Sequence, residues 1–283
     1  MMHPRSIDFS LPLFVPADRP ERYPKAMAAG ADCIIIDLED AVAPADKIQA
    51  RNMLFNALSG MDGSDTIVVR INPYGSVWHG DDVAFIRRCK IAGVMLPKTE
   101  SSSGLRSVKD ALGHHVPVIA LIESAAGIAA ARKIATRAHQ LAFGSIDFAS
   151  DVGCSHTRDA LLLARSELVI ASRNAGRPQP IDGVTTNIRD EATVEDDARY
   201  AASLGFGGKL LIHPAQVAAA RRGLAPSDSD VSWARKVVDA SSGSGAIAVD
   251  GSMVDAPVLA RAHNILQRHD NPKNKVHEHD QSN

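Results

Sequence analysis

The segment Cys33-Ile-Ile-Ile-Asp37 is the clearest indication of the fold in this sequence. Its run of β-branched residues favours an extended strand, and residues typical of turns bound the run. Because both faces of such a strand are apolar, it must be covered on both sides, as strands of a parallel sheet are covered by helices. The segment therefore predicts an α/β fold.

Seven further runs resemble this segment and alternate with helical stretches. The stretches Ala160–Ala175 and Val194–Leu204 are rich in alanine with a helical period, and Gly30, Gly176 and Gly205 stand where helix C-caps belong. Eight strands, each followed by a helix, predict a (β/α)8 TIM barrel, because right-handed crossovers repeated eight times close the sheet. The seven runs are Ser10–Ala17, Thr66–Arg70, Gly93–Pro97, Val116–Ile122, Gln140–Gly144, Ile181–Thr185 and Lys209–His213.

An open, doubly wound sheet is the alternative fold. Sheets of that kind often have a glycine-rich nucleotide-binding turn after the first strand. Here the first strand runs into Pro16-Ala-Asp-Arg-Pro20, so that motif is absent and the barrel is favoured.

The chain continues beyond the eighth predicted strand, which indicates three regions. Residues 1–225 are expected to form the catalytic barrel, residues 226–267 a C-terminal helical extension that acts as a lid or arm, and residues 268–283 a disordered tail. The extension is predicted to contain helices at Ser229–Asp239 and Pro257–Gln267 and a flexible joint at Ser241-Ser-Gly-Ser-Gly245.

Composition restricts the class of protein. Aromatic residues make up only 4% of the 283 residues, so the core must be built from alanine and aliphatic side chains. A net charge of −2 gives no general attraction to nucleic acid or membranes. The three cysteines lack CxxC spacing, which predicts reduced thiols rather than disulfides or a zinc site. With no signal-peptide pattern and no long apolar run, a cytoplasmic location is expected.

Ionisable residues follow nearly every predicted strand. The active site of a barrel lies at the C-terminal ends of its strands, so these residues are the candidates. Glu123 and Asp147 end consecutive strands and could share one Mg²⁺ ion, which keeps several waters and needs only one or two carboxylates. Alternatively, the two carboxylates share a proton or pair with Arg70. The full set is Asp37, Glu39, Asp40, Arg70, Lys98, Glu123, Asp147 and His213.

Arg70 ends an apolar run, and a buried guanidinium needs an acidic partner to which its paired N–H groups can donate two parallel hydrogen bonds. One possibility is Asp37 or Glu39 from the preceding strand; the other is a substrate carboxylate or an enolate oxygen. In the first case Asp37, Glu39 and Asp40 would hold Arg70 and metal-bound waters in place. Substrate contacts are expected for Arg70, Glu123 and Lys98.

Seven motifs in order resemble the HpcH/HpaI aldolase and citrate lyase β-subunit family, in its malyl- and citramalyl-CoA lyase branch. The resemblance implies a (β/α)8 barrel that binds Mg²⁺ through Glu123 and Asp147 and substrate through Arg70. It also implies that Asp255, in Gly251-Ser-Met-Val-Asp-Ala-Pro257, reaches an adjacent subunit of a homo-oligomer, a trimer or hexamer, as an acid/base group. The motifs are Leu13–Ala17, Asp37–Pro44, Val69–Pro73, Leu96–Lys98, Leu121–Ser124, Phe143–Asp147 and Gly208–Gln216.

The resemblance implies a carbon–carbon lyase that cleaves a β-hydroxyacyl-CoA thioester of the malyl-, citramalyl- or citryl-CoA type into an acyl-CoA and an oxo acid. Arg70 would stabilise the enolate, and Asp255 would protonate it, unless Asp255 only caps the following helix. The alternatives are a CoA-independent aldolase for 4-hydroxy-2-oxo acids and a non-catalytic or partner-dependent subunit of a citrate lyase-like complex. Cations for the CoA phosphates are expected at Arg19, Arg22 and Lys25, unless these form only a solvated helix face.

Overall fold

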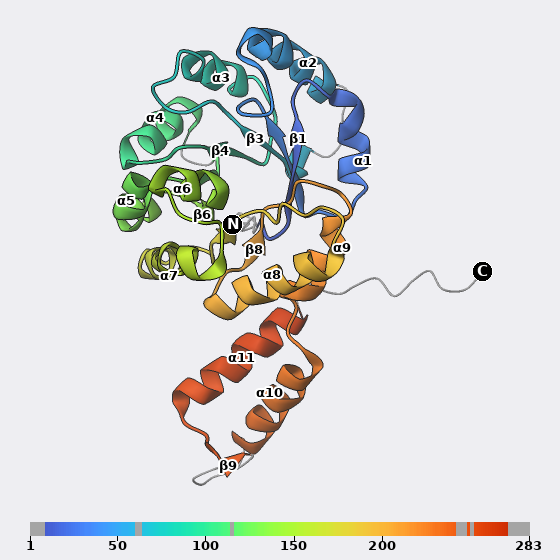
Figure 1. Cartoon of the computed structure of the whole chain (residues 1–283), viewed down its shortest axis with the longest axis vertical. Helices are drawn as coiled ribbons and strands as arrows, with labels where there is room; N and C mark the ends of the chain where they lie inside the picture. The colour runs from blue at the N-terminus through green and yellow to red at the C-terminus, as the bar shows by residue number, and fades with distance from the viewer. Residues whose placement is uncertain (1–8, 60–63, 114–115, 242–247, 250–251, 271–283) are drawn as a thin grey trace, which may run out of the picture.

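Eight parallel strands form one sheet in the order in which they occur along the chain (Figure 1). The computed structural model describes residues 9–59, 64–113, 116–241, 248–249 and 252–270. The sheet strands are β1 (Pro12–Pro16), β2 (Cys33–Asp37), β3 (Ile67–Arg70), β4 (Gly93–Leu96), β5 (Val118–Ile122), β6 (Gln140–Phe143), β7 (Ile181–Asp182) and β8 (Gly208–Lys209).

The sheet closes on itself between its last and first strands. Leu211, just after β8, forms a parallel bridge with Leu13 of β1. Its amide donates to the carbonyl of Pro12 at 2.9 Å, and its carbonyl accepts from the amide of Phe14 at 2.8 Å. Closure distinguishes a (β/α)8 barrel from an open sheet, so the predicted fold is confirmed. β7 and β8 have only two residues each and are shorter than the predicted runs, and beyond Lys209 the chain keeps the single bridge from Leu211 to β1.

Helices connect the strands and surround the barrel. After β1, Pro20–Arg22 forms a 3-10 turn and α1 follows it directly. The helices are α1 (Tyr23–Met27), α2 (Lys47–Ser59), α3 (His79–Ile86), α4 (Ser102–Leu112), α5 (Ala125–Ala135), α6 (Ser145–Val152), α7 (Arg158–Asn174), α8 (Glu191–Leu204), α9 (Gln216–Leu224), α10 (Asp228–Ser241) and α11 (Ala256–Asp270).

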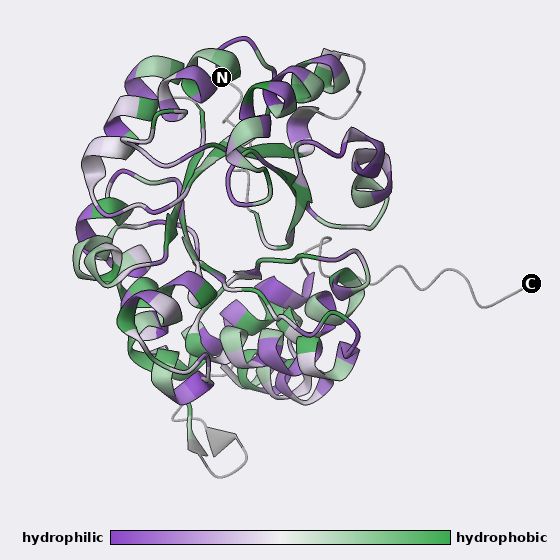
Figure 2. Cartoon of the chain, turned by 45° about the horizontal axis from the view of Figure 1, so that its top comes forward, coloured by the Kyte–Doolittle hydropathy of each residue, from purple (hydrophilic) through white to green (hydrophobic). Residues whose placement is uncertain are grey.

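The barrel strands consist mostly of hydrophobic residues, whereas the helices combine apolar and polar residues (Figure 2). In β2, Ile34 and Ile36 pack in the layer between strands and helices, while Cys33 and Ile35 belong to the core inside the barrel. Because side chains alternate along a strand, the next inward position is Asp37. In several of the strands, the apolar side chains that face the inside of the barrel stop near the C-terminal end of the strand. The next side chains that face inward are polar, and they lie at the mouth of the barrel.

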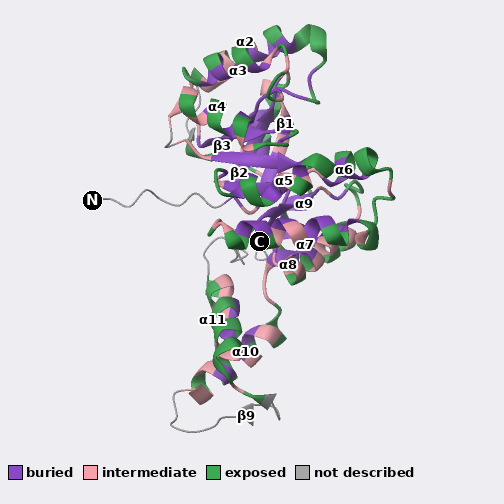
Figure 3. Ribbon diagram, turned by 90° about the vertical axis from the view of Figure 1, so that its left-hand side faces the viewer, coloured by how far each residue is buried: buried purple, intermediate pink, exposed green. Residues whose placement is uncertain are grey.

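Two helices form a separate arm at the C-terminus. α10 and α11 pack on each other through Val231, Ala234, Val237, Ala262 and Ile265, and the pair extends away from the barrel (Figures 1 and 3). The short strands β9 (Ala248–Val249) and β10 (Ser252–Met253) pair between the two helices.

Both helices of the predicted extension are present, although α11 continues to Asp270. Most of the predicted joint, residues 242–245, and of the predicted tail, residues 271–283, lies outside the described residues. No helix in the described ranges is long and apolar enough to cross a membrane.

Candidate functional site

A pocket of about 420 Å³ opens at the C-terminal ends of the barrel strands. Apolar residues such as Phe14, Leu121 and Phe143 line part of it, and polar side chains occupy the rest. Several of the residues predicted from strand ends therefore meet in one cavity. The polar side chains of the lining are Asp37, Asp40, Arg70, Glu123, Ser145 and Asp147.

Glu123 is the buried carboxylate of this pocket. It directly follows β5, is only 4% exposed, and continues the inward series of Ile119 and Leu121. Its Oε1 accepts a 2.6 Å hydrogen bond from the backbone amide of Lys98, whereas its Oε2 is buried without a hydrogen-bond partner. Burial, together with the charges of Glu39 and Asp147, raises the pKa of the carboxyl to about 8, although the Lys98 amide opposes this.

Gly144 makes room for the Glu123 carboxylate. It follows β6 next to Glu123, and a Cβ atom placed there would lie 2.5 Å from Glu123 Oε2. Because this is too close for non-bonded atoms, only glycine leaves the unpartnered oxygen in its present position. Glycine at this position therefore gives the Glu123 carboxylate the space that it occupies beside the pocket.

Asp147 lies in the first turn of α6, not at a strand end, which corrects the predicted location. β6 ends at Phe143 and α6 begins at Ser145, so Asp147 stands on the helix rather than beside the strand. Asp147 is exposed, but it lines the same pocket as Glu123. Its negative charge raises the pKa of the Glu123 carboxyl. The structure thus brings the two carboxylates to one cavity.

The donor set fits a hard divalent cation. Glu123 Oε2 is a buried carboxylate oxygen without a hydrogen-bond partner, and Asp147 adds a second carboxylate at the pocket. In the part of the chain that the structure describes, no cluster of three or more His, Cys, Asp or Glu side chains could bind a metal. Two carboxylates suffice for Mg²⁺, which completes its octahedron with water and substrate oxygens.

Arg70 is paired with Asp37 through its fork. The two residues are opposite each other in the register of β2 and β3. Nε and Nη2 of Arg70 donate to the Asp37 carboxylate at 2.7 and 2.6 Å, and Nη1 lies 3.2 Å from Glu39. Burial opposes the charge of the guanidinium, but the hydrogen bonds and charge of Asp37 more than offset it and raise the pKa of Arg70. Asp37 is therefore the bidentate partner of Arg70.

The loop after β2 holds its own acidic residues in place. Asp37 accepts hydrogen bonds from the amides of Glu39 at 2.8 Å and Ala41 at 3.0 Å. Glu39 is 3% exposed and contacts the ammonium of Lys98. Burial raises the pKa of Glu39, while Arg70 and Lys98 oppose that shift. This arrangement fits the supporting role predicted for the loop.

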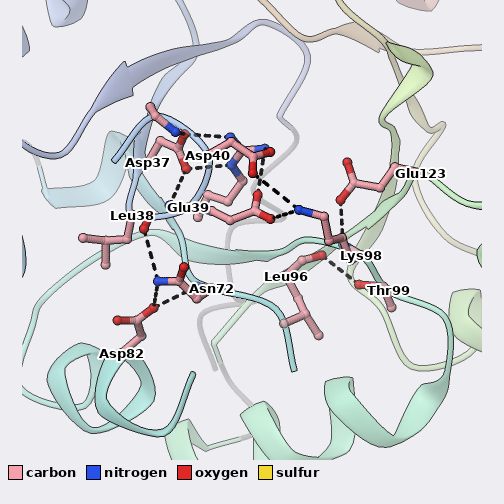
Figure 4. A network of polar contacts seen from close by, with 12 residues as sticks. Asp37, Leu38, Glu39, Asp40, Asn72, Asp82, Leu96, Lys98, Thr99 and Glu123 are labelled. Carbon is pink, nitrogen blue, oxygen red and sulfur yellow. Dashed lines mark hydrogen bonds and ion pairs between the residues drawn. The ribbon is translucent and has the colours of Figure 1, made fainter. Parts of the chain in front are cut away.

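Three residues that the sequence analysis did not name as site residues hold this loop in place, and two of them, Asn72 and Asp82, are seen in Figure 4. The buried ammonium of Lys47 donates to the carbonyls of Leu38 at 2.8 Å and Glu39 at 2.7 Å. Asn72 donates to the Leu38 carbonyl at 3.1 Å and to the fully buried Asp82 at 2.6 Å. Asn72 stands in one of the motifs that carry the resemblance, whereas nothing local to Lys47 or Asp82 indicates their contacts.

Ser145 and His156 form a contact near the pocket that the sequence analysis did not predict. Ser145 is 1% exposed and lines the cavity, and its hydroxyl lies 2.9 Å from Nε2 of the exposed His156. Burial and the nearby charge of Arg165 lower the pKa of His156. The loop that brings His156 to Ser145 has no sequence pattern that predicts this contact.

Asp255 lies at the start of α11, outside the pocket of its own chain. Its carboxylate accepts a 3.0 Å hydrogen bond from the amide of Val258, so it caps the helix as the alternative interpretation predicted. The side chain is exposed, on an arm that extends away from the barrel. A contact between Asp255 and a substrate pocket thus requires a second copy of the chain.

The raised pKa of Glu123 predicts a pH-dependent stability when metal is removed with a chelator. Between the ordinary carboxyl value of 4.5 and about 8, the folded state keeps this proton and the unfolded state releases it. The free energy of unfolding therefore falls as pH rises through this window, by up to about 1.4 kcal/mol per pH unit. Urea unfolding across the window checks this: Glu123→Gln should lack that part of the slope, and equal slopes in both proteins would contradict the assignment.

Comparisons with known proteins agree with this architecture. Residues 11–214 match the family model described as HpcH/HpaI aldolase/citrate lyase. A citrate lyase subunit beta-like protein of Mycobacterium tuberculosis is 38% identical over 266 residues, covering 90% of this chain and 94% of the relative. The L-malyl-CoA/beta-methylmalyl-CoA lyase of Cereibacter sphaeroides is 33% identical over 297 residues, covering 90% and 93%.

A solved structure extends this similarity to three dimensions. The crystal structure of the CitE protein of Mycobacterium tuberculosis, in complex with magnesium, acetoacetate and coenzyme A, superposes with a TM-score of 0.83 at 36% identity. The match covers 93% of this chain and 99% of that one. The similarity to a protein of known structure therefore extends over most of the chain.

Proposed function

The chain belongs to the HpcH/HpaI aldolase/citrate lyase family, and from that premise we propose that it is a Mg²⁺-dependent lyase for CoA esters. The proposed reaction breaks the carbon–carbon bond of a β-hydroxyacyl-CoA of the malyl-, citramalyl- or citryl-CoA type. Its products are an acyl-CoA, such as acetyl-CoA, and an oxo acid. The observation that carries the proposal is the buried, unpartnered Oε2 of Glu123 in a pocket that also contains Asp147 and Arg70.

The metal would be held by Glu123 and Asp147. Mg²⁺ would supply a Lewis acid that polarises the substrate oxygens it binds. With only two protein carboxylates as ligands, the ion would have room for water and for oxygens of the substrate. In the M. tuberculosis relative, magnesium and acetoacetate are present together in the crystal, which supports a site of this kind.

Arg70 would stabilise the charge that develops during cleavage. When the carbon–carbon bond breaks, the hydroxyl gives its proton to a base, for which we propose Asp255 of a neighbouring subunit, and becomes a carbonyl. The bonding electrons pass to the thioester fragment, which becomes an enolate whose oxygen carries negative charge. Arg70 lines the pocket with Asp37 holding its orientation, so its positive charge is in place before the reaction begins. Preorganised charge of this kind lowers the barrier because nothing has to reorient in the transition state.

The rest of the substrate would lie outside the pocket. A volume of about 420 Å³ suits the small acyl part of the thioester, so the CoA portion must extend over the barrel mouth. Arg19, Arg22 and Lys25 are exposed just after β1, at the end of the barrel where the pocket opens. We propose that cations from this segment contact the CoA phosphates.

Asp255 would complete the site from another subunit. The enolate carbon must receive a proton, and an aspartate at the start of α11 is a suitable donor. Because the arm extends away from its own barrel, the proposal requires a homo-oligomer in which the arm of one copy reaches the pocket of the next.

Assays of the purified chain test the proposed function. The protein is incubated with Mg²⁺ and a panel containing malyl-, citramalyl- and citryl-CoA and free 4-hydroxy-2-oxo acids. Cleavage of a thioester supports the proposal, whereas cleavage of a free oxo acid alone makes the chain a CoA-independent aldolase. No turnover of either class would indicate a partner-dependent or non-catalytic subunit.

Arg70→Lys should lower kcat more than it raises KM. Lysine keeps the charge but loses the fork that Asp37 orients, so enolate stabilisation should fall and kcat should drop at least about tenfold. Steady-state kinetics with the thioester of the panel that is cleaved fastest measures kcat and KM separately. Asp37→Asn should show the same pattern more weakly, and normal turnover of Arg70→Lys at saturating substrate would reduce Arg70 to a binding residue.

A further inference from the structure

Lys98 has a backbone conformation that residues other than glycine rarely adopt. Its φ of +46° is the only positive value at a non-glycine residue in the described part of the chain. The left-handed region is sterically unfavourable for such residues, and it persists only where surrounding contacts impose it. Lys98 stands just after β4, at the mouth of the barrel.

This turn directs the amide of Lys98 at Glu123. The amide donates to Glu123 Oε1 at 2.6 Å, a short hydrogen bond to a carboxylate. The next residue, Thr99, is buried and fixes the turn from the other side, because its amide donates to Leu121 and its hydroxyl to the carbonyl of Leu96. One oxygen of Glu123 is thereby occupied by the main chain, and the other remains free.

The side chain of Lys98 makes a separate connection. Its ammonium contacts Glu39 and lies 3.4 Å from Asp40, and Glu39 in turn lies 3.2 Å from Nη1 of Arg70 (Figure 4). The residue therefore joins the two halves of the pocket, with its main chain on the Glu123 side and its ammonium on the Arg70 side.

We propose that Lys98 is a positioning residue with two separable functions. Its left-handed main chain fixes the Glu123 carboxylate so that Oε2 is presented to a divalent cation, and its ammonium holds Glu39 and, through it, Arg70. The inference rests on the proposed function, since it assigns Glu123 to the metal and Arg70 to the enolate. A turn that served only to connect β4 to α4 would have no effect on metal affinity beyond its effect on folding.

Two substitutions separate these functions. Lys98→Gly removes the ammonium but tolerates a φ of +46°, whereas Lys98→Val removes the ammonium and disfavours that conformation. Mg²⁺ affinity is measured by calorimetric titration of the metal-free protein, and folding by thermal unfolding. We expect wild-type Mg²⁺ affinity for Lys98→Gly and at least about tenfold weaker binding for Lys98→Val. In the glycine variant kcat should fall at least about tenfold, because Glu39 and Arg70 lose the ammonium that holds them.

Each result decides one part of the proposal. Equal Mg²⁺ affinities for the glycine and valine variants would overturn the main-chain function, and wild-type kcat for Lys98→Gly would overturn the ammonium function. If Lys98→Val does not fold, Lys98→Asn and Lys98→Ala replace the pair, because asparagine accepts the left-handed region more readily than alanine. Wild-type protein that binds no Mg²⁺ would instead contradict the proposed function.

Discussion

Glu123→Gln and Asp147→Asn are each expected to abolish Mg²⁺ binding and to lower kcat about a thousandfold, a loss of about 4 kcal/mol of transition-state stabilisation. Both substitutions preserve the size of the side chain and remove the negative charge that the cation requires. Glu123 is buried without a full set of partners, so neutralising it should not lower stability. Asp147 is exposed on α6, so the fold should not depend on its charge.

Calorimetric titration with Mg²⁺ and thermal unfolding check this prediction together. Asp151→Asn provides a matched control on the same helix: Asp151 accepts a 2.7 Å hydrogen bond from the amide of Ala125, a contact that asparagine retains. This variant should bind Mg²⁺ normally. Undiminished Mg²⁺ affinity in both Glu123→Gln and Asp147→Asn would show that these two carboxylates do not bind the metal.

Asp255→Asn is expected to lower turnover about a hundredfold or more while leaving stability nearly unchanged. Asparagine keeps the side-chain oxygen that accepts from Val258, so the cap of α11 should survive. If Asp255 only caps the helix, both rate and Tm stay at their wild-type values. Asp239→Asn on α10 is a control for charge removal on the same arm and should leave turnover unchanged.

A mixing experiment tests whether the site is shared between subunits. Inactive Asp255→Asn chains are combined with inactive Glu123→Gln chains after dissociation and reassembly. If Asp255 of one copy serves the pocket of another, some sites in the mixed oligomer contain both native residues and part of the activity returns. Absence of recovery in a confirmed mixed oligomer would confine each site to one chain.

The fold could be predicted because parallel strands have a distinctive composition. Strands buried on both faces become continuous apolar runs, and Cys33–Asp37 was predicted with the bounds that the structure gives. The weakest predictions were β7 and β8: only Ile181 and Asp182 of the first predicted run lie in β7, and only Lys209 of the second lies in β8, which begins at Gly208. There the chain leaves the sheet early, and no local sequence pattern marks that point.

The sequence predicted which residues belong to the candidate site better than it predicted which residues contact one another. Charges at strand ends identified Asp37, Arg70 and Glu123, because a barrel collects all of its strand ends at one mouth. Asp147 was found at the right end of the barrel but on the wrong element, since Gly144 ends the strand and the helix begins at once. The support from Lys47 had no local sequence signal and depends on packing between distant segments.

The sequence by itself determined the order of strands and helices and the set of ionisable residues at the barrel mouth, because both follow from hydrophobic pattern along the chain. Only the tertiary structure decided which of these residues face inward and which partner each one has. A uniformly apolar strand does not reveal its inward face, and the pairing of Arg70 with Asp37 follows from strand register. The hydrogen bond from Lys98 to Glu123 likewise joins residues 25 positions apart, so it forms only when β4 and β5 lie side by side in the sheet.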